Sequence, residues 1–276
     1  MSSSDTISPT AHYTGYVWAR NGLSHPALVT AEGRLFYGAL APMMRASRAL
    51  SGPSLEAYLL ARHRAIDAGL QTAITTHGIT QVIEIAAGLS PRGWRFAQRF
   101  GDAITYIETD LPAMAARKRR ALERIGSLSA RHQVRDLDAL RDDGALSLSA
   151  LASELRPGGG LVVITEGLTG YLSPRDLAGL WRRIATVAGG FRAGRYLSDL
   201  HLGGSPPLEI RIGRRLLSAF VRGGVYLHFP DGAHAETALR DAGFATARVA
   251  PARAPAGGRE TMAHILEAST TDRGRR

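Results

Sequence analysis

The chain has 276 residues, 45% of them hydrophobic, which suits one large α/β domain with added helices. Its lack of cysteine excludes a disulfide framework, a thiolate metal site and a cysteine nucleophile. The polar amino terminus lacks the order of a signal peptide, and no apolar stretch approaches the roughly 18 residues that span a bilayer. We therefore expect a cytoplasmic protein with no metal centre and no membrane partner.

The formal net charge of +10 is carried almost wholly by arginine, because Lys118 is the only lysine. Clustered cations favour nucleic acid through counterion release. Net charge by itself determines no partner, however, and a composition rich in Arg, Ala and Gly also reflects GC-rich codons. A nucleic-acid partner is thus the minor alternative, and a small substrate with an anionic group is modestly favoured.

Apolar residues at helical spacing predict helices over 26–50 and 54–76, separated by Ser51-Gly52-Pro53. Strands and helices then alternate, which indicates right-handed crossovers and a parallel sheet. The expected strands are 81–86, 103–109, 131–135, 161–165 and 195–202, and the expected helices are 91–100, 112–125, 145–155 and 174–188.

The last part of the chain has a different pattern. A helical insertion is expected at 206–224, followed by a helix at 231–242 and strands at 244–249 and 261–266. The short Pro/Gly-rich link between these strands favours a hairpin, which places one antiparallel strand at the sheet edge. The predicted fold is therefore α/β, with a seven-stranded, mostly parallel sheet, helices on both faces and extra N-terminal helices.

The first strand ends in a turn of small residues, Ala86-Ala87-Gly88, whose backbone amides are open to a ligand. Asp110 closes the next strand about 20 residues later, where an acid can accept hydrogen bonds from a ribose diol. This pairing predicts a cofactor that contains a nucleoside.

Three segments carry a more specific resemblance: Glu84–Arg92, Tyr106–Pro112 and Thr165–Leu172. In order and spacing they resemble the leucine carboxyl methyltransferase-like family, which has a Rossmann-like fold and includes many bacterial O-methyltransferases. The resemblance implies S-adenosyl-L-methionine as cofactor and O-methylation of a carboxyl or hydroxyl group on a small metabolite, polyketide-like compounds included, or on a peptide end. It divides the chain into an N-terminal arm and helices (1–78) and a cofactor-binding domain (79–270) with a lid near 206–224.

The same resemblance implies a set of cofactor ligands. Ala86 and Gly88 would lie against the methionine part, with Ala86 in place of the family's first glycine and Ser90 in place of the following acid. Arg62 would hold the cofactor carboxylate, and Arg64 is the alternative. Asp110 would bind the ribose, with Glu108 on the same strand face.

Three further positions complete the implied site. Asp136 and Leu137 would border the adenine, although a solvated turn explains the aspartate equally well. Glu166 ends a very apolar strand, where an unpaired charge is expensive. It is expected to accept from the cofactor ammonium or to shape the methyl-transfer site, and a structural salt bridge is the alternative.

A carboxylate acceptor needs no general base, whereas a hydroxyl acceptor does. The candidates for such a base are Asp199 and His201, then His228, and Glu166 and Tyr171 join the predicted catalytic residues. The substrate is expected to meet the insertion, with its Arg211, Arg214 and Arg215, and an aromatic N-terminal arm that contains Tyr13, Tyr16 and Trp18.

Three rival functions remain open. An RNA methyltransferase suits the charge, but no RNA-binding module is recognisable. A catalytically idle cofactor-binding protein is the second, since the glycine motif is altered. A nicotinamide dehydrogenase is disfavoured because its glycine spacing differs and because the predicted sheet ends in a hairpin. The sequence carries no prediction of oligomeric state.

Overall fold

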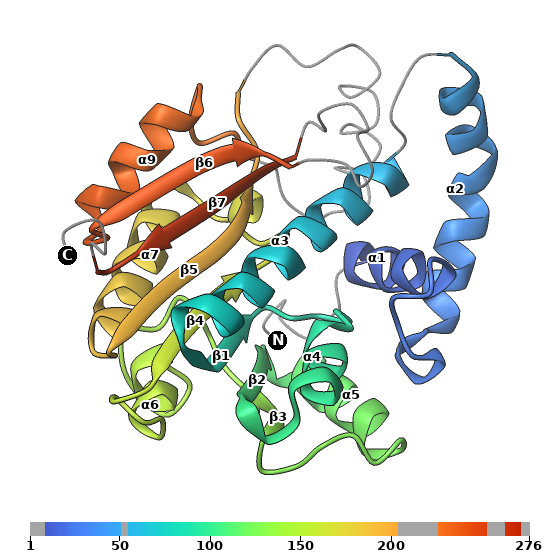
Figure 1. The fold of residues 1–276 in the computed structure, drawn as a ribbon. Helices are drawn as coiled ribbons and strands as arrows, with labels where there is room; N and C mark the ends of the chain where they lie inside the picture. The colour runs from blue at the N-terminus through green and yellow to red at the C-terminus, as the bar shows by residue number, and fades with distance from the viewer. Residues whose placement is uncertain (1–8, 51–54, 204–225, 253–262, 272–276) are drawn as a thin grey trace.

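The computed structural model describes residues 9–50, 55–203, 226–252 and 263–271 (Figure 1). The predicted helical insertion at 206–224 lies outside these residues. Three helices precede the sheet: α1 (Pro9–Arg20), α2 (Ala31–Leu50) and α3 (Leu55–His77). The aromatic arm expected from the sequence therefore forms a helix, α1, which packs against α2 and α3. The division at residue 78 stays a prediction.

Seven strands form one sheet in the order β3-β2-β1-β4-β5-β7-β6. Their bounds are β1 (Ile79–Ile85), β2 (Thr105–Asp110), β3 (His132–Asp136), β4 (Gly160–Thr165), β5 (Ala193–Leu200), β6 (Thr246–Pro251) and β7 (His264–Ser269). The pairs among β1 to β5 are parallel, and β7 is antiparallel to both β5 and β6. The predicted sheet is confirmed, and its antiparallel strand lies one place inside the edge strand β6.

Helices cover both faces of the sheet (Figure 1). One face carries α3, α4 (Arg92–Phe100) and α5 (Pro112–Glu123), and the other carries α6 (Leu148–Ser153), α7 (Pro174–Gly189) and α9 (Gly232–Asp241). Every residue of β4 is buried, as its unbroken apolar run predicts for a strand covered on both sides. The sheet thus separates two apolar layers.

Strand alternation places acidic side chains in the layer below α3 and α4. Glu84 of β1 pairs in register with Glu108 of β2 and with Ile164 of β4, so these three side chains share one face. Glu166 follows Ile164 by two residues, which directs it to the same face. The α3 side of the sheet is therefore apolar near its amino edge and charged near its carboxyl edge.

Candidate active site

The predicted cofactor turn lies at the carboxyl end of β1. Ala86 and Gly88 both have left-handed backbone angles, with φ of 52° and 50°. The Gly88 amide donates to Asp110 Oδ2 at 2.7 Å, and the Ala87 amide donates to the Thr109 carbonyl at 2.9 Å. The small-residue turn and the acid of β2 are thus in direct contact, as their spacing in the sequence predicts.

Asp110 is held by backbone amides on both oxygens. Its Oδ1 accepts from the Leu111 amide at 2.8 Å, and burial raises its pKa above the ordinary value although these two amide bonds oppose the rise. A carboxylate has about four lone-pair sites, so two amide bonds leave acceptor capacity for a ribose diol. The geometry fits the expected ribose role, which stays a prediction.

Glu108 has different surroundings, although it shares a strand face with Asp110. It is fully buried, forms an ion pair with Lys118, and lies 2.8 Å from His132 Nε2 through Oε1. Burial would raise its pKa, but Lys118 and His132 hold that pKa below the ordinary value. We therefore favour a structural role for Glu108, in fastening α5 and β3 to β2, over contact with the cofactor.

Arg62 of α3 reaches two acids at the carboxyl ends of β4 and β5. Its Nε lies 3.0 Å from Glu166 Oε1, and its Nη1 lies 3.2 Å from Asp199 Oδ2. Asp199 Oδ1 also accepts from the Gly167 amide at 2.7 Å. Arg64 is exposed, whereas Arg62 is buried beside Glu166. The structure therefore favours Arg62 over Arg64 as the arginine of the site.

A second buried arginine, Arg92 at the start of α4, joins three acids. Its guanidinium lies 2.7 Å from Asp67, 2.5 Å from Glu84 and 2.5 Å from Glu166. His63 Nδ1 lies 2.8 Å from Glu166 Oε2 and 2.9 Å from Arg92 Nη2. We call this group the buried charge cluster; its members are Arg62, His63, Asp67, Glu84, Arg92, Glu166 and Asp199, with the side chain of Glu166 4% exposed.

The cluster favours the ionised form of Glu166 and of Asp67. Burial alone would raise the pKa of Glu166, but His63, Arg92 and Arg62 together hold it well below the ordinary value. Asp67 has a lowered pKa for the same reason, with His63 and Arg92 outweighing burial. A buried charge is tolerated when it is paired and hydrogen-bonded, and here each acid is both.

Sequence reasoning missed several members of this cluster. Glu84 interrupts an apolar strand and could have been found by the cost of an unpaired charge in a buried strand. Arg92 lies in the first family motif but received no role, and His63 adjoins Arg62. None of the three can be paired with its partners from sequence spacing alone, because α3, β1 and α4 meet only in the fold.

The remaining predicted ligands lie at the rims of the site. Leu137 is buried and its amide donates to the Asp110 carbonyl at 2.8 Å, while Asp136 is partly exposed and pairs with Arg119 at 2.8 Å. Leu137 is therefore adjacent to Asp110, the acid predicted to bind the ribose, and its adenine role stays a prediction. Tyr171 is 38% exposed in a short 3-10 turn after β4, and its catalytic role stays a prediction.

The three candidate bases differ in how their polar atoms are engaged. Both oxygens of Asp199 are bonded, as described above. His201 Nε2 lies 2.7 Å from the hydroxyl of Tyr58, a residue whose pKa is raised by burial and whose phenol therefore stays neutral. His228 Nε2 lies 2.9 Å from the carbonyl oxygen of Thr169, a residue three positions after Glu166 in the chain.

Helix α1 lies over the cofactor turn. A Cβ built on Gly88 would meet Ala11 Cβ at 3.6 Å, and one built on Gly15 would meet Leu89 Cβ at 3.1 Å. The Trp18 ring stacks obliquely on His63 with a centroid distance of 4.8 Å. The N-terminal helices thus form one wall of the site, and their contact with a substrate stays a prediction.

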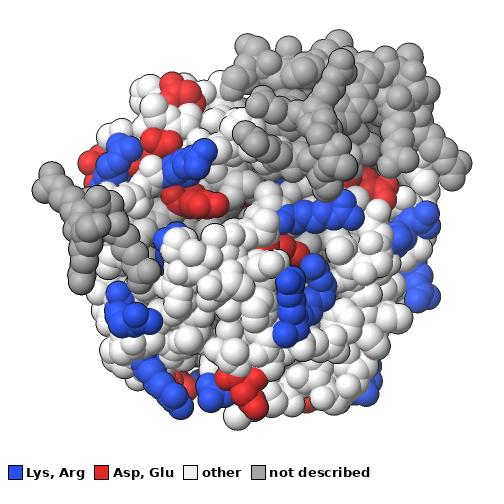
Figure 2. Space-filling view, viewed as in Figure 1, with Lys and Arg blue, Asp and Glu red and all other residues white. Residues whose placement is uncertain are grey.

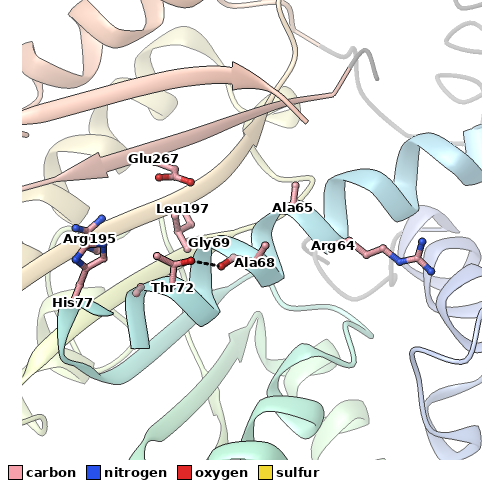
Figure 3. A pocket seen from close by; sticks show the side chains of 10 residues that line it. Arg64, Ala65, Ala68, Gly69, Thr72, His77, Arg195, Leu197 and Glu267 are labelled. Carbon is pink, nitrogen blue, oxygen red and sulfur yellow. Dashed lines mark hydrogen bonds between the residues drawn. The ribbon is translucent and has the colours of Figure 1, made fainter. Parts of the chain in front are cut away.

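A separate groove of 460 Å³ lies between α3 and the β5–β7 pair (Figure 3). Thr72, His77, Arg195, Leu197 and Glu267 line it, and Arg64 points away from them at its far end. Apart from Arg64, the alternative to Arg62, it contains none of the predicted cofactor ligands. This groove is therefore distinct from the site at the carboxyl edge of the sheet.

The surface charge is dispersed on the face that Figure 2 shows. Lysine and arginine side chains occur there in small groups, with acidic and uncharged residues between them. A duplex-sized nucleic-acid footprint needs a continuous basic stripe or patch. This face does not supply one among the described residues. No helix in the described part of the chain is both long and apolar enough to cross a bilayer.

Comparison with known families agrees with the motifs and the site. The model of the Leucine carboxyl methyltransferase family matches residues 24–185, which is more than half of the chain. The chain belongs to this family. The matched region contains the buried charge cluster apart from Asp199, together with the turn and Asp110, so most of the candidate site lies within the part of the chain that the family model covers.

Curated relatives are similar over part of their length. A candidate S-adenosyl-L-methionine-dependent methyltransferase of Mycobacteroides abscessus is 32% identical over 136 residues, covering 49% of this chain and 41% of that protein. A protein of the same description from Mycolicibacterium vanbaalenii is 35% identical over 116 residues, covering 41% of this chain and 36% of that protein. The matches thus span about two fifths of these relatives.

Solved structures confirm the methyltransferase fold. A candidate methyltransferase of Thermobifida fusca superposes with a TM-score of 0.68 at 13% identity, covering 96% of each chain. Human N-acetylserotonin methyltransferase in complex with SAM gives a TM-score of 0.55 at 14% identity, covering 98% of this chain and 74% of that one. At these identities the likeness concerns the fold alone.

Proposed function

We propose that the protein is an S-adenosyl-L-methionine-dependent O-methyltransferase that acts on a carboxyl or hydroxyl group of a small molecule. The observation that carries the proposal is the contact between the Gly88 amide and Asp110 beside a buried Arg62–Glu166 pair. These groups lie at the carboxyl edge of β1, β2 and β4, where ligands bind in sheets of this topology.

The residues fit the chemistry of this cofactor. Its amino-acid end carries one carboxylate and one ammonium, and the site offers a guanidinium on Arg62 and a carboxylate on Glu166, 3.0 Å apart. Its nucleoside end needs a ribose acceptor and an apolar surface for the base, which Asp110 and Leu137 supply. We assign Arg62 to the cofactor carboxylate, Glu166 to the ammonium, Asp110 to the ribose and Leu137 to the adenine.

The open backbone turn after β1 allows a ligand to approach closely. Gly88 carries no side chain, and Ala86 carries only a methyl group, so the backbone amides of the turn are within reach of a ligand. Asp110 already uses one of those amides, and binding would let the acid exchange an internal bond for bonds to ribose hydroxyls. We expect this exchange to cost little, because the carboxylate remains fully hydrogen-bonded.

When bound, the cofactor supplies a methyl group that its sulfonium centre already activates. The chain's own part is then to position the acceptor oxygen and to exclude water. The buried charge cluster is suited to positioning the acceptor and excluding water, because its side chains are held by mutual ion pairs and lie away from solvent. Helix α1 closes the site from the N-terminal side, through Ala11, Gly15 and Trp18.

A labelling experiment tests the function. The protein is incubated with S-adenosyl-L-methionine carrying a trideuterated methyl group and with a panel of phenols, alcohols and carboxylic acids, and products are analysed by mass spectrometry. We expect a labelled methyl ether or ester from at least one acceptor, and at least about 10-fold less of it from Asp110→Ala at a subsaturating cofactor concentration. Labelled RNA with unlabelled small molecules would favour the RNA methyltransferase, and cofactor binding without any transfer would favour an idle binder.

A further inference from the structure

His228 has one ring nitrogen bonded and the other unused. Its Nε2 lies 2.9 Å from the carbonyl oxygen of Thr169, and a carbonyl can only accept, so this nitrogen carries the proton. In the neutral ring the other nitrogen, Nδ1, is then an acceptor. Within the described residues Nδ1 is buried and has no hydrogen-bond partner. Buried polar atoms are usually satisfied, so an unused acceptor calls for an explanation.

The position of His228 is at the carboxyl edge of the sheet. Leu202, just after β5, forms a parallel bridge with Phe229, and the Gly203 amide donates to the Phe229 carbonyl at 2.8 Å. On its other side the segment 226–229, which contains His228, meets the turn after β4, where the Tyr226 amide donates to the Gly170 carbonyl at 2.8 Å. His228 thus lies between the ends of β4 and β5, the strands that carry Glu166 and Asp199.

The other two candidate bases lack this arrangement. Asp199 is bonded to Arg62 and to the Gly167 amide, and its full burial makes release of both bonds costly. His201 Nε2 lies 2.7 Å from the Tyr58 hydroxyl, which can donate or accept, so this bond does not fix the tautomer of His201. Of the three bases that the sequence offers, His228 has a tautomer fixed by a main-chain carbonyl and a lone pair left for a substrate.

We propose that His228 Nδ1 is the proton acceptor of the reaction and that the methylated group is therefore a hydroxyl rather than a carboxylate. This inference rests on the proposed O-methyltransferase function. The hydroxyl oxygen forms a bond to the methyl carbon as the carbon–sulfur bond breaks, and the electron pair of that bond stays on sulfur. The hydroxyl proton moves to Nδ1, leaving a methyl ether, S-adenosyl-L-homocysteine and a protonated imidazole. A carboxylate acceptor would bring no proton and would leave this base without a task.

The aromatic neighbours of His228 agree with a planar acceptor. Tyr226 stacks on the imidazole at 5.7 Å with an interplanar angle of 24°, and Phe229 lies 6.1 Å away. Tyr226 itself is 44% exposed, so it presents aromatic surface next to the base. Aromatic rings favour offset stacking with other aromatic rings. A phenol is therefore the hydroxyl class that these surroundings suit best.

The first test compares His228→Gln with the parent protein. The probes are phenol, catechol and 4-methoxyphenol as weakly acidic phenols, with benzoate and phenylacetate as carboxylates, and transfer is measured from pH 6 to pH 10. General-base catalysis contributes about 10²–10⁴-fold, so we expect kcat on a phenol to fall at least 100-fold near pH 7. The deficit should shrink as the pH approaches the phenol's own pKa of about 10, because the acceptor then ionises without help. His234→Gln, on the exposed start of α9, is the matched control and should keep the parental rate.

Several outcomes would overturn the inference. They are a His228→Gln rate within threefold of the parent, a loss that is the same at every pH, transfer to carboxylates but to no phenol, and cofactor binding without transfer to any phenol. Failure to bind S-adenosyl-L-homocysteine would instead count against the proposed function itself.

A second readout needs no substrate. Long-range proton–nitrogen NMR of histidine-labelled protein should show that His228 is protonated at Nε2 and unprotonated at Nδ1. The signals of His228 are identified by their loss from the spectrum of His228→Gln. That variant should bind S-adenosyl-L-homocysteine with an affinity within twofold of the parent. A proton on Nδ1 at neutral pH would contradict the assignment.

Discussion

Replacing Arg92 by methionine tests whether the buried charge cluster holds the N-terminal helices to the sheet. Arg92 is fully buried and bonds Asp67, Glu84 and Glu166. Without it, Asp67 keeps Arg95 and Glu166 keeps Arg62, but Glu84 keeps only the Tyr106 hydroxyl at 2.6 Å. The variant therefore leaves one buried carboxylate without a cation.

Breaking a buried pair by removing one partner costs about 3–5 kcal/mol. With a urea slope of about 2.5 kcal/mol per molar, the midpoint should fall by about 1–2 M. Tryptophan fluorescence and circular dichroism follow the transition, and agreement between them checks that it remains two-state. Arg135→Met is the matched control, because its ion pair with Glu154 is 39% and 53% exposed and should contribute less than about 1 kcal/mol.

A second substitution isolates the cause. Glu84→Gln in the Arg92→Met background removes the unpaired charge and leaves an acceptor for Tyr106, so it should recover about 1–3 kcal/mol. The reasoning would be refuted if Arg92→Met lost less than about 1 kcal/mol at an unchanged urea slope, or if the double variant were less stable than the single one.

Three further predictions concern the same layer and the turn. The folded state holds the pKa of Glu166 well below its ordinary value of 4.5, so the stability that this carboxylate contributes is complete above pH 4.5 and is lost as the pH falls below that value. Urea midpoints measured against pH should show this loss, and Glu166→Gln should make the pH dependence flatter. Gly93→Ala should destabilise by about 3 kcal/mol, because its Cβ would lie 2.6 Å from Glu108 Cγ in an ion-paired side chain, whereas Gly158→Ala meets nothing within 4 Å and should change stability little; equal urea midpoints would contradict this. Ala86→Gly should stabilise by about 0.5 kcal/mol, since relief of the left-handed φ of 52° exceeds the chain entropy of glycine; a lower melting temperature would argue against strain there.

The sequence predicted those features that depend on local patterns. The unbroken apolar run of β4 indicated a buried parallel strand, and the spacing from Gly88 to Asp110 placed the turn and the acid together because each ends a neighbouring parallel strand. The family motifs added Arg62 and Glu166, which the fold places 3.0 Å apart. The turn, Asp110 and Glu166 share a cause: a strand end fixes the position of the side chains beside it without reference to distant packing.

The sequence did not predict the features that depend on contacts between distant elements. Period-two alternation puts Glu108 on the same face as Asp110, but α4 and α5 cover Glu108 and give it Lys118 and His132 as partners. The aromatic stretch that the sequence analysis describes as an N-terminal arm forms the helix α1. Arg92 and His63 find their acids on other elements, and no spacing within one segment encodes such a meeting.

The central claim is that Asp110 and its turn form the nucleoside site of S-adenosyl-L-methionine. Isothermal titration of the parent, Asp110→Ala and Glu108→Gln with S-adenosyl-L-homocysteine and with NAD tests it directly. Losing a charge-assisted hydrogen bond costs about 1.5–3 kcal/mol, so we predict binding by the parent, roughly 10- to 150-fold weaker binding by Asp110→Ala, and no binding of NAD. Equal affinity in the parent and Asp110→Ala, or binding of NAD in place of S-adenosyl-L-homocysteine, would contradict the account.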